Sequence, residues 1–311
     1  MFGFSLDVWI SIIISVCAAS TPLLLAATGE LIVERSGVLN LGVEGMMIMG
    51  AVAGFSAAQL SGSPYVGALI AVFAGAIFSL LFGFLTLTLV ANQVATGLAL
   101  TILGLGLSGM IGEGFVGQPG IKMLPIEIPL LSDIPIIGKI LFGQDIIFYT
   151  SILLVFAVGW FLFKTKAGLQ LRSVGDNHTS AHALGINVIK TRYLAVMFGG
   201  ACAGLAGAHL SLVYVPQWVE GMTAGRGWIA LALVVFSSWR PMRLLVGAYL
   251  FGAVTIAQFH VQALGIGIPA QFLTSLPYIA TIIVLVIIAR NRRMTMINTP
   301  ASLGKSFVPD R

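Results

Sequence analysis

Nine apolar segments separated by short polar loops constrain this chain more than any other feature of its sequence. Hydrophobic residues make up 58% of the chain and charged residues only 9%, whereas soluble domains carry about 25% charged residues. A bilayer core about 30 Å thick requires about 20 apolar residues per helix. We therefore predict an all-α, polytopic transmembrane bundle whose seventh segment is short, and hence broken or half-spanning. The predicted segments are 8–28, 38–60, 64–90, 94–115, 146–163, 192–214, 227–239, 244–263 and 272–290.

The distribution of cations among the loops predicts the orientation. With nine spans, alternate loops lie on the same side of the membrane. One set of loops is richly basic: Lys164, Lys166, Arg172, Lys190, Arg192, Arg240, Arg243, Arg290, Arg292 and Arg293. The other set balances its cations with acids: Lys122, Lys139, Glu127, Asp133, Asp145, Glu220 and Arg226. Because basic loops face the cytoplasm, we expect the N-terminus outside, the C-terminus inside, and residues 294–311 as a disordered cytoplasmic tail.

Several motifs suggest chemistry that their context excludes. Gly104, Gly106 and Gly109 match a dinucleotide-binding pattern but lie inside an apolar span, where small residues favour helix packing. The stretch 304–306 ends like a phosphate-binding loop, yet Thr299 stands where its first glycine belongs. The four histidines are scattered, and no catalytic set is visible. The sequence predicts no metal site, no cofactor and no enzyme activity. The net charge is +5, but the chain has no patch of interleaved aromatic and basic residues of the kind that binds nucleic acid.

Polar and charged residues interrupt the stretch "GELIVERSGVLNLGVEGMMIMG". Glu30, Glu34 and Arg35 lie at the predicted cytoplasmic end of the first span, where an interfacial charge cluster could anchor the helix or contact a partner. Asn40 and Glu44 are four residues apart within the second span. A charge inside hydrocarbon costs at least about 2.5–3.5 kcal/mol, so this pair should face either another helix or a water-filled path.

Asn92 and Gln93 begin the fourth span and carry the same ambiguity. Either they make buried structural hydrogen bonds, or they bind a solute directly.

The longest basic loop, residues 164–192, contains an ordered element. Asp176 or Asn177 is a good N-cap, "HTSAHAL" can form about two helical turns, and Gly185 stands where a glycine ends a helix. The small side chain of Ala181 would allow close approach of another surface. This short helix is either an ordinary connection or a docking element for a cytoplasmic partner.

Four segments together resemble a known family. "GELIVERSGVLNLGVEGMMIMGA", "GLQLRSVGDNHTSAHALGINV", "NQVATGLAL" and "RPMRLLVGAYLFGA" look like permease subunits of ATP-binding-cassette (ABC) importers of the branched-chain amino acid and ribose type. The closest resemblance is to permeases of nucleoside importers, whose binding proteins belong to the basic membrane protein family. It extends from about Pro22 to Ile288.

The resemblance implies a multi-pass permease domain, residues 1–293, in a bacterial inner membrane and surrounded by lipid. It implies a coupling helix within 172–188 that docks on a separate ABC ATPase subunit. Further partners would be a second, related permease and an extracytoplasmic solute-binding protein. The implied site residues are Asn40, Glu44, Asn92 and Gln93 along the substrate path, and Arg172, Gly175, Asp176, Asn177, Ala181 and Gly185 for coupling.

Other functions stay open at this point. The same machine could carry a simple sugar or a branched-chain amino acid, because the binding protein largely sets the cargo. An ion-coupled secondary transporter would instead use Glu44 as its coupling carboxylate. A membrane-embedded enzyme is the weakest alternative, since no catalytic set is visible.

Overall fold

Helices account for the regular secondary structure in the computed structural model, which describes residues 6–126, 129, 131, 132, 134, 136–263, 269–289 and 298–308. Within those residues the only β-type pairing is an isolated bridge between Pro119 and Gln217. The helices are α1 (Leu6–Arg35), α2 (Val43–Ser61), α3 (Pro64–Gly83), α4 (Gln93–Gly112), α5 (Ile137–Leu141), α6 (Ile146–Lys164), α7 (Lys166–Asp176), α8 (His178–Ala183), α9 (Val188–His209), α10 (Arg226–Phe236), α11 (Pro241–Ala263) and α12 (Ala270–Ala289). Single π-helical turns, η1 (Phe84–Thr88) and η3 (Leu210–Tyr214), extend α3 and α9, and a 3₁₀ turn, η2 (Glu113–Phe115), extends α4.

Among the described residues, seven helices are long and apolar enough to cross a membrane: α1, α2, α3 with η1, α4 with η2, α6, α9 with η3, and α11. The all-helical membrane bundle is thus confirmed, with seven supported spans where the sequence predicts nine. Helix α10 has 11 residues and rises about 16 Å, roughly half of a bilayer core. Helix α12 has 20 residues and coincides with the ninth predicted segment.

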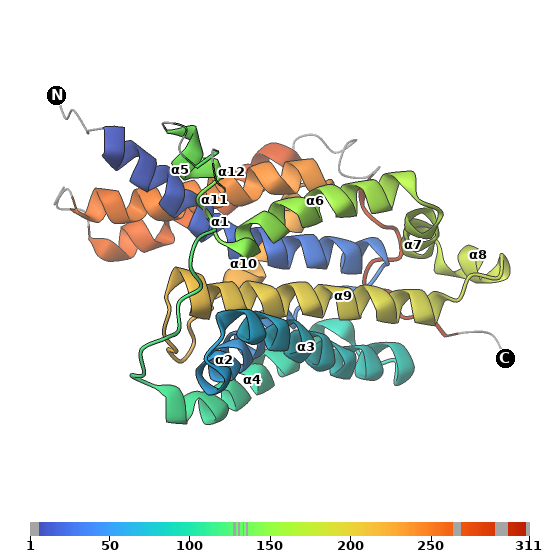
Figure 1. Ribbon diagram of the computed structural model, residues 1–311. Coiled ribbons are helices and arrows are strands. Elements are labelled where there is room, and N and C mark those ends of the chain that lie inside the picture. The colour runs from blue at the N-terminus through green and yellow to red at the C-terminus, as the bar shows by residue number, and fades with distance from the viewer. Residues whose placement is uncertain are drawn as a thin grey trace.

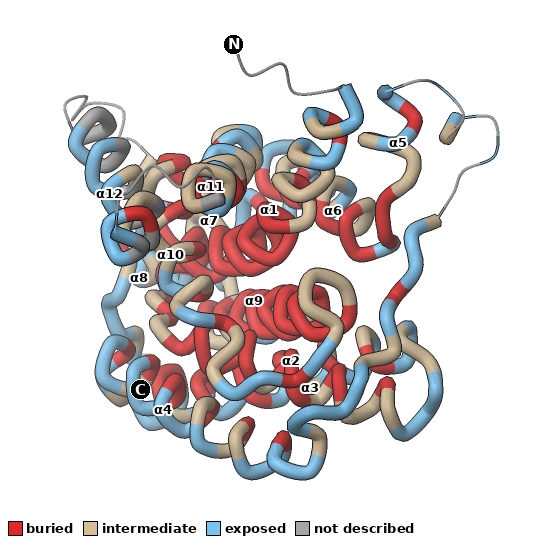
Figure 2. Tube along the Cα trace, turned by 90° about the vertical axis from the view of Figure 1, so that its left-hand side faces the viewer, coloured by how far each residue is buried: buried red, intermediate tan, exposed pale blue. Residues whose placement is uncertain are grey.

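Helices α1, α2 and α9 form the buried centre of the molecule (Figure 2). Helix α9 lies between α1 on one side and α2 with α3 on the other (Figure 1). Glycines allow this approach. A Cβ atom on Gly204 of α9 would overlap the carbonyl oxygen of Ala71 in α3, and one on Gly75 would overlap the carbonyl oxygen of Gly200. Helices whose backbones touch in this way gain dispersion contacts and need no large side chains at the seam.

Distant segments gather at the end of the bundle where α1 ends, which we call the Arg35 end. Gly175 of α7 packs directly on the carbonyl oxygen of Arg35. Trp239, between α10 and α11, accepts two hydrogen bonds from the Arg35 guanidinium through its backbone carbonyl. The basic loops that carry Lys164, Lys190 and Arg240 therefore lie at one end, as their shared sign predicts. Glu127, Asp133, Arg290, Arg292 and Arg293 lie outside the described residues.

The prediction that the C-terminal tail is disordered is wrong for residues 298–308. The backbone N–H of Ser302 donates to the carbonyl oxygen of Gly175 at 2.8 Å, and that of Gly304 donates to Gly37 at 3.1 Å. Sequence pattern missed this docking because the segment is short and has no periodicity.

The three glycines of the misleading motif in α4 differ in their surroundings. Gly104 packs against the backbone of Gly45, as the helix-packing interpretation predicts. Gly109 faces the side chain of Glu220, and nothing lies within 4 Å of a Cβ atom built on Gly106. The motif therefore combines one close helix contact with one exposed position.

Candidate functional site

Glu44 holds the N-terminus of α10 inside the bundle. Its Oε1 accepts hydrogen bonds from the Thr223 hydroxyl at 2.6 Å and the Gly225 backbone N–H at 2.7 Å, and its Oε2 accepts one from the Gly227 N–H at 2.6 Å. The side chain is almost fully buried. A carboxylate on the free N–H groups of a helix start is also stabilised by the helix dipole. Glu44 of α2 thus acts as a hydrogen-bond acceptor that ties α2 to the start of α10.

The backbone on both sides of α10 is strained. Ala224 and Gly225 have φ of 48° and 80° immediately before the helix, and Ser238 and Trp239 have φ of 51° and 54° just after it. Residues other than glycine seldom adopt positive φ, and strain of this kind concentrates at sites that switch or bind. Helix α10 is therefore a short rod between two strained turns, with Glu44 fixing its inner end.

A second break in helical structure lies between α1 and α2, at 36–42. This segment folds back into the bundle, where the Asn40 backbone N–H donates to Oε1 of Glu30 at 3.3 Å. The Leu39 N–H donates to Oε1 of Gln93 at 2.8 Å, and the Gly42 N–H donates to Oδ1 of Asn40 at 3.0 Å. Non-helical backbone at membrane depth must find such partners inside the protein. Asn40 and Gln93 supply them.

Two polar atoms beside this segment remain without a hydrogen-bond partner. They are Nε2 of Gln93 and Oε2 of Glu30, and both are buried. Buried polar atoms are normally paired, so an unpaired donor and acceptor here are available to a solute or to a second arrangement of the segment.

Asn92 has a different role from its neighbour Gln93. It is exposed, and its Oδ1 accepts a hydrogen bond from the Ala95 N–H at 3.0 Å, which makes it the N-cap of α4. We expect Asn92→Ala to lower the free energy of unfolding by about 1 kcal/mol, while Asn92→Ser retains most of it. Thermal unfolding of the purified protein measures this. If Asn92 contacted cargo directly, Asn92→Ser would instead change uptake without changing stability.

Glu30, Glu34 and Arg35 are all buried, which corrects the expectation of an interfacial charge cluster. Oε2 of Glu34 accepts a hydrogen bond from the Trp239 indole at 2.6 Å. Among the described residues Arg35 has no ion pair with either carboxylate. It donates instead to the backbone carbonyls of Trp239 and Asn298. These residues join the end of α1 to other segments of the protein and present nothing to an external partner.

The basic loop forms two helices, α7 and α8, where the sequence predicts one. The predicted α8 is confirmed: Oδ1 of Asn177 accepts from the Ser180 N–H at 3.0 Å, and Gly185 follows the helix with φ of 82°. Helix α7 was missed; Thr165 caps it by accepting from the Gly168 N–H. A T-x-x-G pattern before an amphipathic stretch is the signal that could have found it.

The six predicted coupling residues divide between two faces. Gly175 and Ala181 are buried: Gly175 packs on the end of α1, and Ala181 lies in a small core with Val174 and Val188. Asp176, Asn177 and Gly185 are exposed, and the half-buried Arg172 holds its guanidinium 5.2 Å from the centre of the Phe163 ring. The small side chain of Ala181 thus serves packing within this chain.

Sequence reasoning missed the exposed Leu184, whose side chain is 81% accessible at the tip of α8. Leu184 directly precedes Gly185, the glycine that ends this helix.

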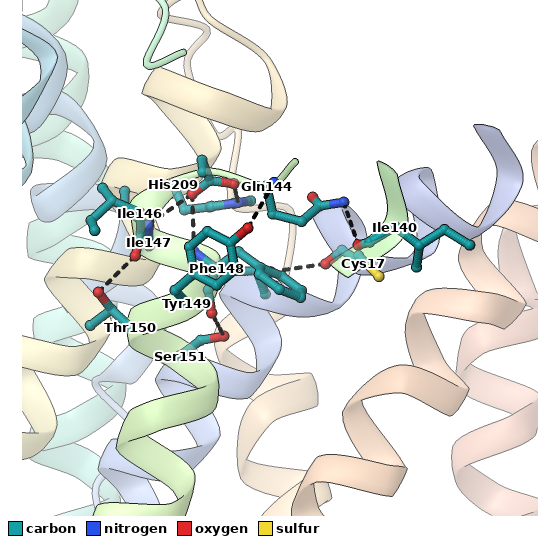
Figure 3. Close-up of polar contacts among 12 residues, drawn as sticks. Cys17, Ile140, Gln144, Ile146, Ile147, Phe148, Tyr149, Thr150, Ser151 and His209 are labelled. Atoms are coloured by element: carbon teal, nitrogen blue, oxygen red, sulfur yellow. Dashed lines mark hydrogen bonds and ion pairs between the residues drawn. The ribbon is translucent and has the colours of Figure 1, made fainter. Parts of the chain in front are cut away.

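The opposite end of the bundle holds a buried acid and imidazole. Asp145 caps α6 by accepting from the Ile147 and Phe148 N–H groups, and one of its oxygens lies 3.7 Å from Nε2 of the fully buried His209. Figure 3 shows His209 beside the start of α6, with Tyr149 hydrogen-bonded to the Gln144 backbone. Among the described residues no group of three His, Cys, Asp or Glu side chains could hold a metal ion.

Comparison with known proteins supplies the family. Residues 12–289 match the family described as the permease component of branched-chain amino acid transport systems. The chain belongs to this family. It is a permease component of an ABC importer and a multi-pass protein of the inner membrane, and its relatives are permease subunits rather than enzymes.

Three ABC transporter permeases are among the relatives that cover most of the chain. A putative glucose ABC transporter permease from Haloferax volcanii is 39% identical over 93% of this chain and 94% of its own length. A guanosine ABC transporter permease from Bacillus subtilis is 36% identical over 86% of this chain and 88% of its own. A nucleoside ABC transporter permease from Lactococcus lactis is also 36% identical, with the same coverage. No solved structure matches the chain.

Proposed function

We propose that this permease imports nucleosides by alternating access, driven by ATP hydrolysis in a separate partner subunit. The observation that carries this proposal is the half-length helix α10, held within the bundle by Glu44 and flanked by strained turns. A short helix whose start lies at membrane depth is a common way to build a solute site. The guanosine and nucleoside relatives support the choice of cargo.

The proposed topology has the Arg35 end in the cytoplasm and the N-terminus outside. In this topology the non-helical segment 215–225 and helix α10 together form one span. The chain then crosses the membrane nine times. Two observations support this: Arg240 and the α7–α8 helices lie at the same end as Arg35, and α10 ends near Trp239 at that end. The excess of cations at this end favours the cytoplasmic side.

The proposed substrate path runs between the 36–42 segment and the start of α10. Asn40 and Glu44 shape it by fixing the two broken backbones, and Asn92 caps the helix that borders it. Gln93 is the residue we assign to direct contact, because its Nε2 is a donor without a partner. A ribose hydroxyl or a base edge offers the matching acceptor.

The proposed coupling surface is the exposed side of α7 and α8, from Arg172 to Gly185, with Leu184 as its apolar anchor. A groove on the ATPase would receive this tip. A second, related permease and an extracytoplasmic binding protein complete the proposed complex. Residues 1–293 form the transmembrane domain of this proposal and residues 294–311 its cytoplasmic tail.

We expect Gly185→Val to abolish most uptake while insertion in the membrane stays normal. Valine at a φ of 82° costs on the order of 1–3 kcal/mol, which disfavours the turn that ends α8. No atom lies within 4 Å of a Cβ at this position, so the effect comes from backbone strain alone. Gly185→Asn is the control, since asparagine tolerates positive φ. Uptake that is equal in the two variants and the parent would contradict a coupling role.

The proposed function is tested by co-purification followed by reconstitution. The tagged permease is isolated in mild detergent with its ATPase, second permease and binding protein, and placed in liposomes. ATP-dependent uptake of labelled guanosine, competed by other nucleosides and not by glucose, is the expected result. Transport by the permease alone without ATP would overturn it.

Glucose is a second candidate cargo, favoured by the 39% identity to a putative glucose permease. A nucleoside and a hexose both present ring hydroxyls, so one path could suit either. Competition by glucose and not by nucleosides in the same assay would select this candidate.

A further inference from the structure

Two buried arginines clasp the C-terminal segment Asn298–Val308 from both ends. Arg35 donates from Nη1 to the Asn298 carbonyl oxygen at 3.0 Å. Arg192, in the second turn of α9, donates from Nη1 to the Lys305 carbonyl oxygen at 3.0 Å. Within the described residues neither guanidinium has a carboxylate at ion-pair distance. Burying an arginine against neutral carbonyl groups is costly unless the hydrogen bonds are well made, so both side chains are committed to holding this segment.

The same arginines join the segment to the membrane helices. Arg192 also donates from Nε to the Ser36 carbonyl oxygen at 3.2 Å, immediately after α1. Arg35 donates to the Trp239 carbonyl oxygen, immediately after the turn that ends α10. Arg35 and Arg192 therefore connect the C-terminal segment to the beginning of the 36–42 segment and to the cytoplasmic end of α10. These two elements border the proposed substrate path.

The segment is joined equally closely to the coupling helices. The Ser302 N–H donates to the Gly175 carbonyl oxygen at 2.8 Å. The ring of Phe307 lies 5.3 Å from the rings of His178 and His182, edge to face. Phe307 also packs on the small core formed by Val174, Ala181 and Val188. Each end of the segment thus touches a different part of the machine.

His178 of α8 lies beside one of the two arginines that hold the C-terminal segment. Nη2 of Arg192 lies 3.3 Å from Nδ1 of His178. Because a guanidinium has only donors, Nδ1 must be the unprotonated acceptor. Burial, followed by the nearby cations Arg192 and Lys305, lowers the pKa of His178 below its ordinary value. The neutral ring needed for this contact is thus the favoured form at neutral pH.

We propose that Asn298–Val308 is a coupling strap that transmits movement of α7 and α8 to the ends of α1 and α10, with Arg35 and Arg192 as its positioning residues. This inference rests on the proposed function, in which α8 is moved by an ATPase. Without the strap, α8 contacts the bundle through α7, α9 and their loops, so the ATPase can still dock and turn over. Helix α7 also touches the end of α1 directly, because Gly175 packs on the Arg35 carbonyl oxygen. The strap adds a second connection, in which the Gly304 N–H donates to the Gly37 carbonyl oxygen at 3.1 Å.

The test compares Phe307→Ala with Val308→Ala in the reconstituted complex. Val308 is the adjacent residue and is mostly exposed, so its truncation should leave all readouts unchanged. Phe307→Ala should keep assembly and ATP hydrolysis within about twofold while lowering nucleoside uptake per ATP about tenfold, within the usual range of coupling between sites. Ser302→Pro, which removes the N–H donated to Gly175, should give the same separation of hydrolysis from uptake.

Two outcomes would overturn the strap. Unchanged uptake per ATP in both Phe307→Ala and Ser302→Pro would show that the segment carries no movement. Loss of the ATPase during purification would make the segment a docking element instead. A parent complex without ATP-dependent uptake would remove the proposed function itself, which distinguishes that failure from failure of the strap alone.

Discussion

Replacing Gly204 by leucine is expected to leave no stable permease and no uptake. Gly204 lies in the second half of α9, and even a Cβ atom there would overlap the Ala71 carbonyl oxygen and lie 3.1 Å from the Gly75 Cα atom. The obstacle is backbone of α3, which cannot rotate away as a side chain does. Overpacking typically costs about 1–3 kcal/mol when side chains can adjust, and here α3 and α9 must separate. The amount of monodisperse protein in mild detergent measures the effect.

Gly106→Leu is the matched control, because nothing lies within 4 Å of a Cβ at that position in α4. Leucine there gains about 1 kcal/mol of helix propensity over glycine. We expect this variant to purify like the parent. Equal yields of the two variants would contradict the close packing of α3 on α9.

The sequence predicts well those features of this fold that depend on local pattern. Most of the apolar segments overlap helices, although the predicted segment 38–60 begins before α2, and its first residues, including Asn40, are not helical. The cap at Asn177 with the glycine at Gly185 gives the ends of α8. Composition also predicts that Glu44 needs a partner, because an unpaired charge in a bilayer is too costly. Local rules succeed here because each involves residues within one turn or one span.

The partners of the polar residues depend instead on which distant segments meet. Glu44 accepts from residues 179 to 183 positions later in the chain, and the Trp239 indole donates to Glu34 across 205 positions. The neighbouring Arg35 suggests an ion pair with Glu34, but a backbone carbonyl is its true acceptor. No periodicity encodes such pairs, so the sequence could single out these polar residues by type and position but could not identify their hydrogen-bond partners.

The docking of Asn298–Val308 is a second case in which the sequence pattern does not reveal a contact between distant segments. Its anchors are backbone groups of Ser302 and Gly304 together with a single aromatic ring at Phe307. Backbone donors are the same in every sequence, and one phenylalanine after a basic stretch is not a pattern. Only the assembled Arg35 end reveals that these atoms have matching acceptors.

We expect Glu44→Gln to lower uptake about 100-fold, equivalent to about 3 kcal/mol. The parent carboxylate accepts from the Thr223 hydroxyl and from the N–H groups of Gly225 and Gly227. Glutamine has the same shape but only one acceptor oxygen, so its NH₂ group must face a backbone N–H in either orientation. A buried donor left without an acceptor costs about 1–3 kcal/mol, and the loss of negative charge at the start of α10 adds to this. Uptake kinetics and thermal unfolding of the purified variant measure both consequences.

Thr223 supplies the control that separates fixing α10 from binding cargo. Thr223→Val removes one donor to Glu44 and should lower stability by about 1–2 kcal/mol, whereas Thr223→Ser keeps the hydroxyl and should behave as the parent. If Glu44 acts by holding α10, the effects of Glu44→Gln and Thr223→Val on stability will not add, because both break one network. A raised KM for nucleoside in Glu44→Gln, with unchanged stability and no response to Thr223→Val, would instead make Glu44 a cargo ligand. Glu44 accepts hydrogen bonds both from the turn before α10, at Thr223 and Gly225, and from Gly227 within α10. We therefore expect the effects of the two substitutions on stability to be non-additive. The position of this short helix then sets the proposed substrate path.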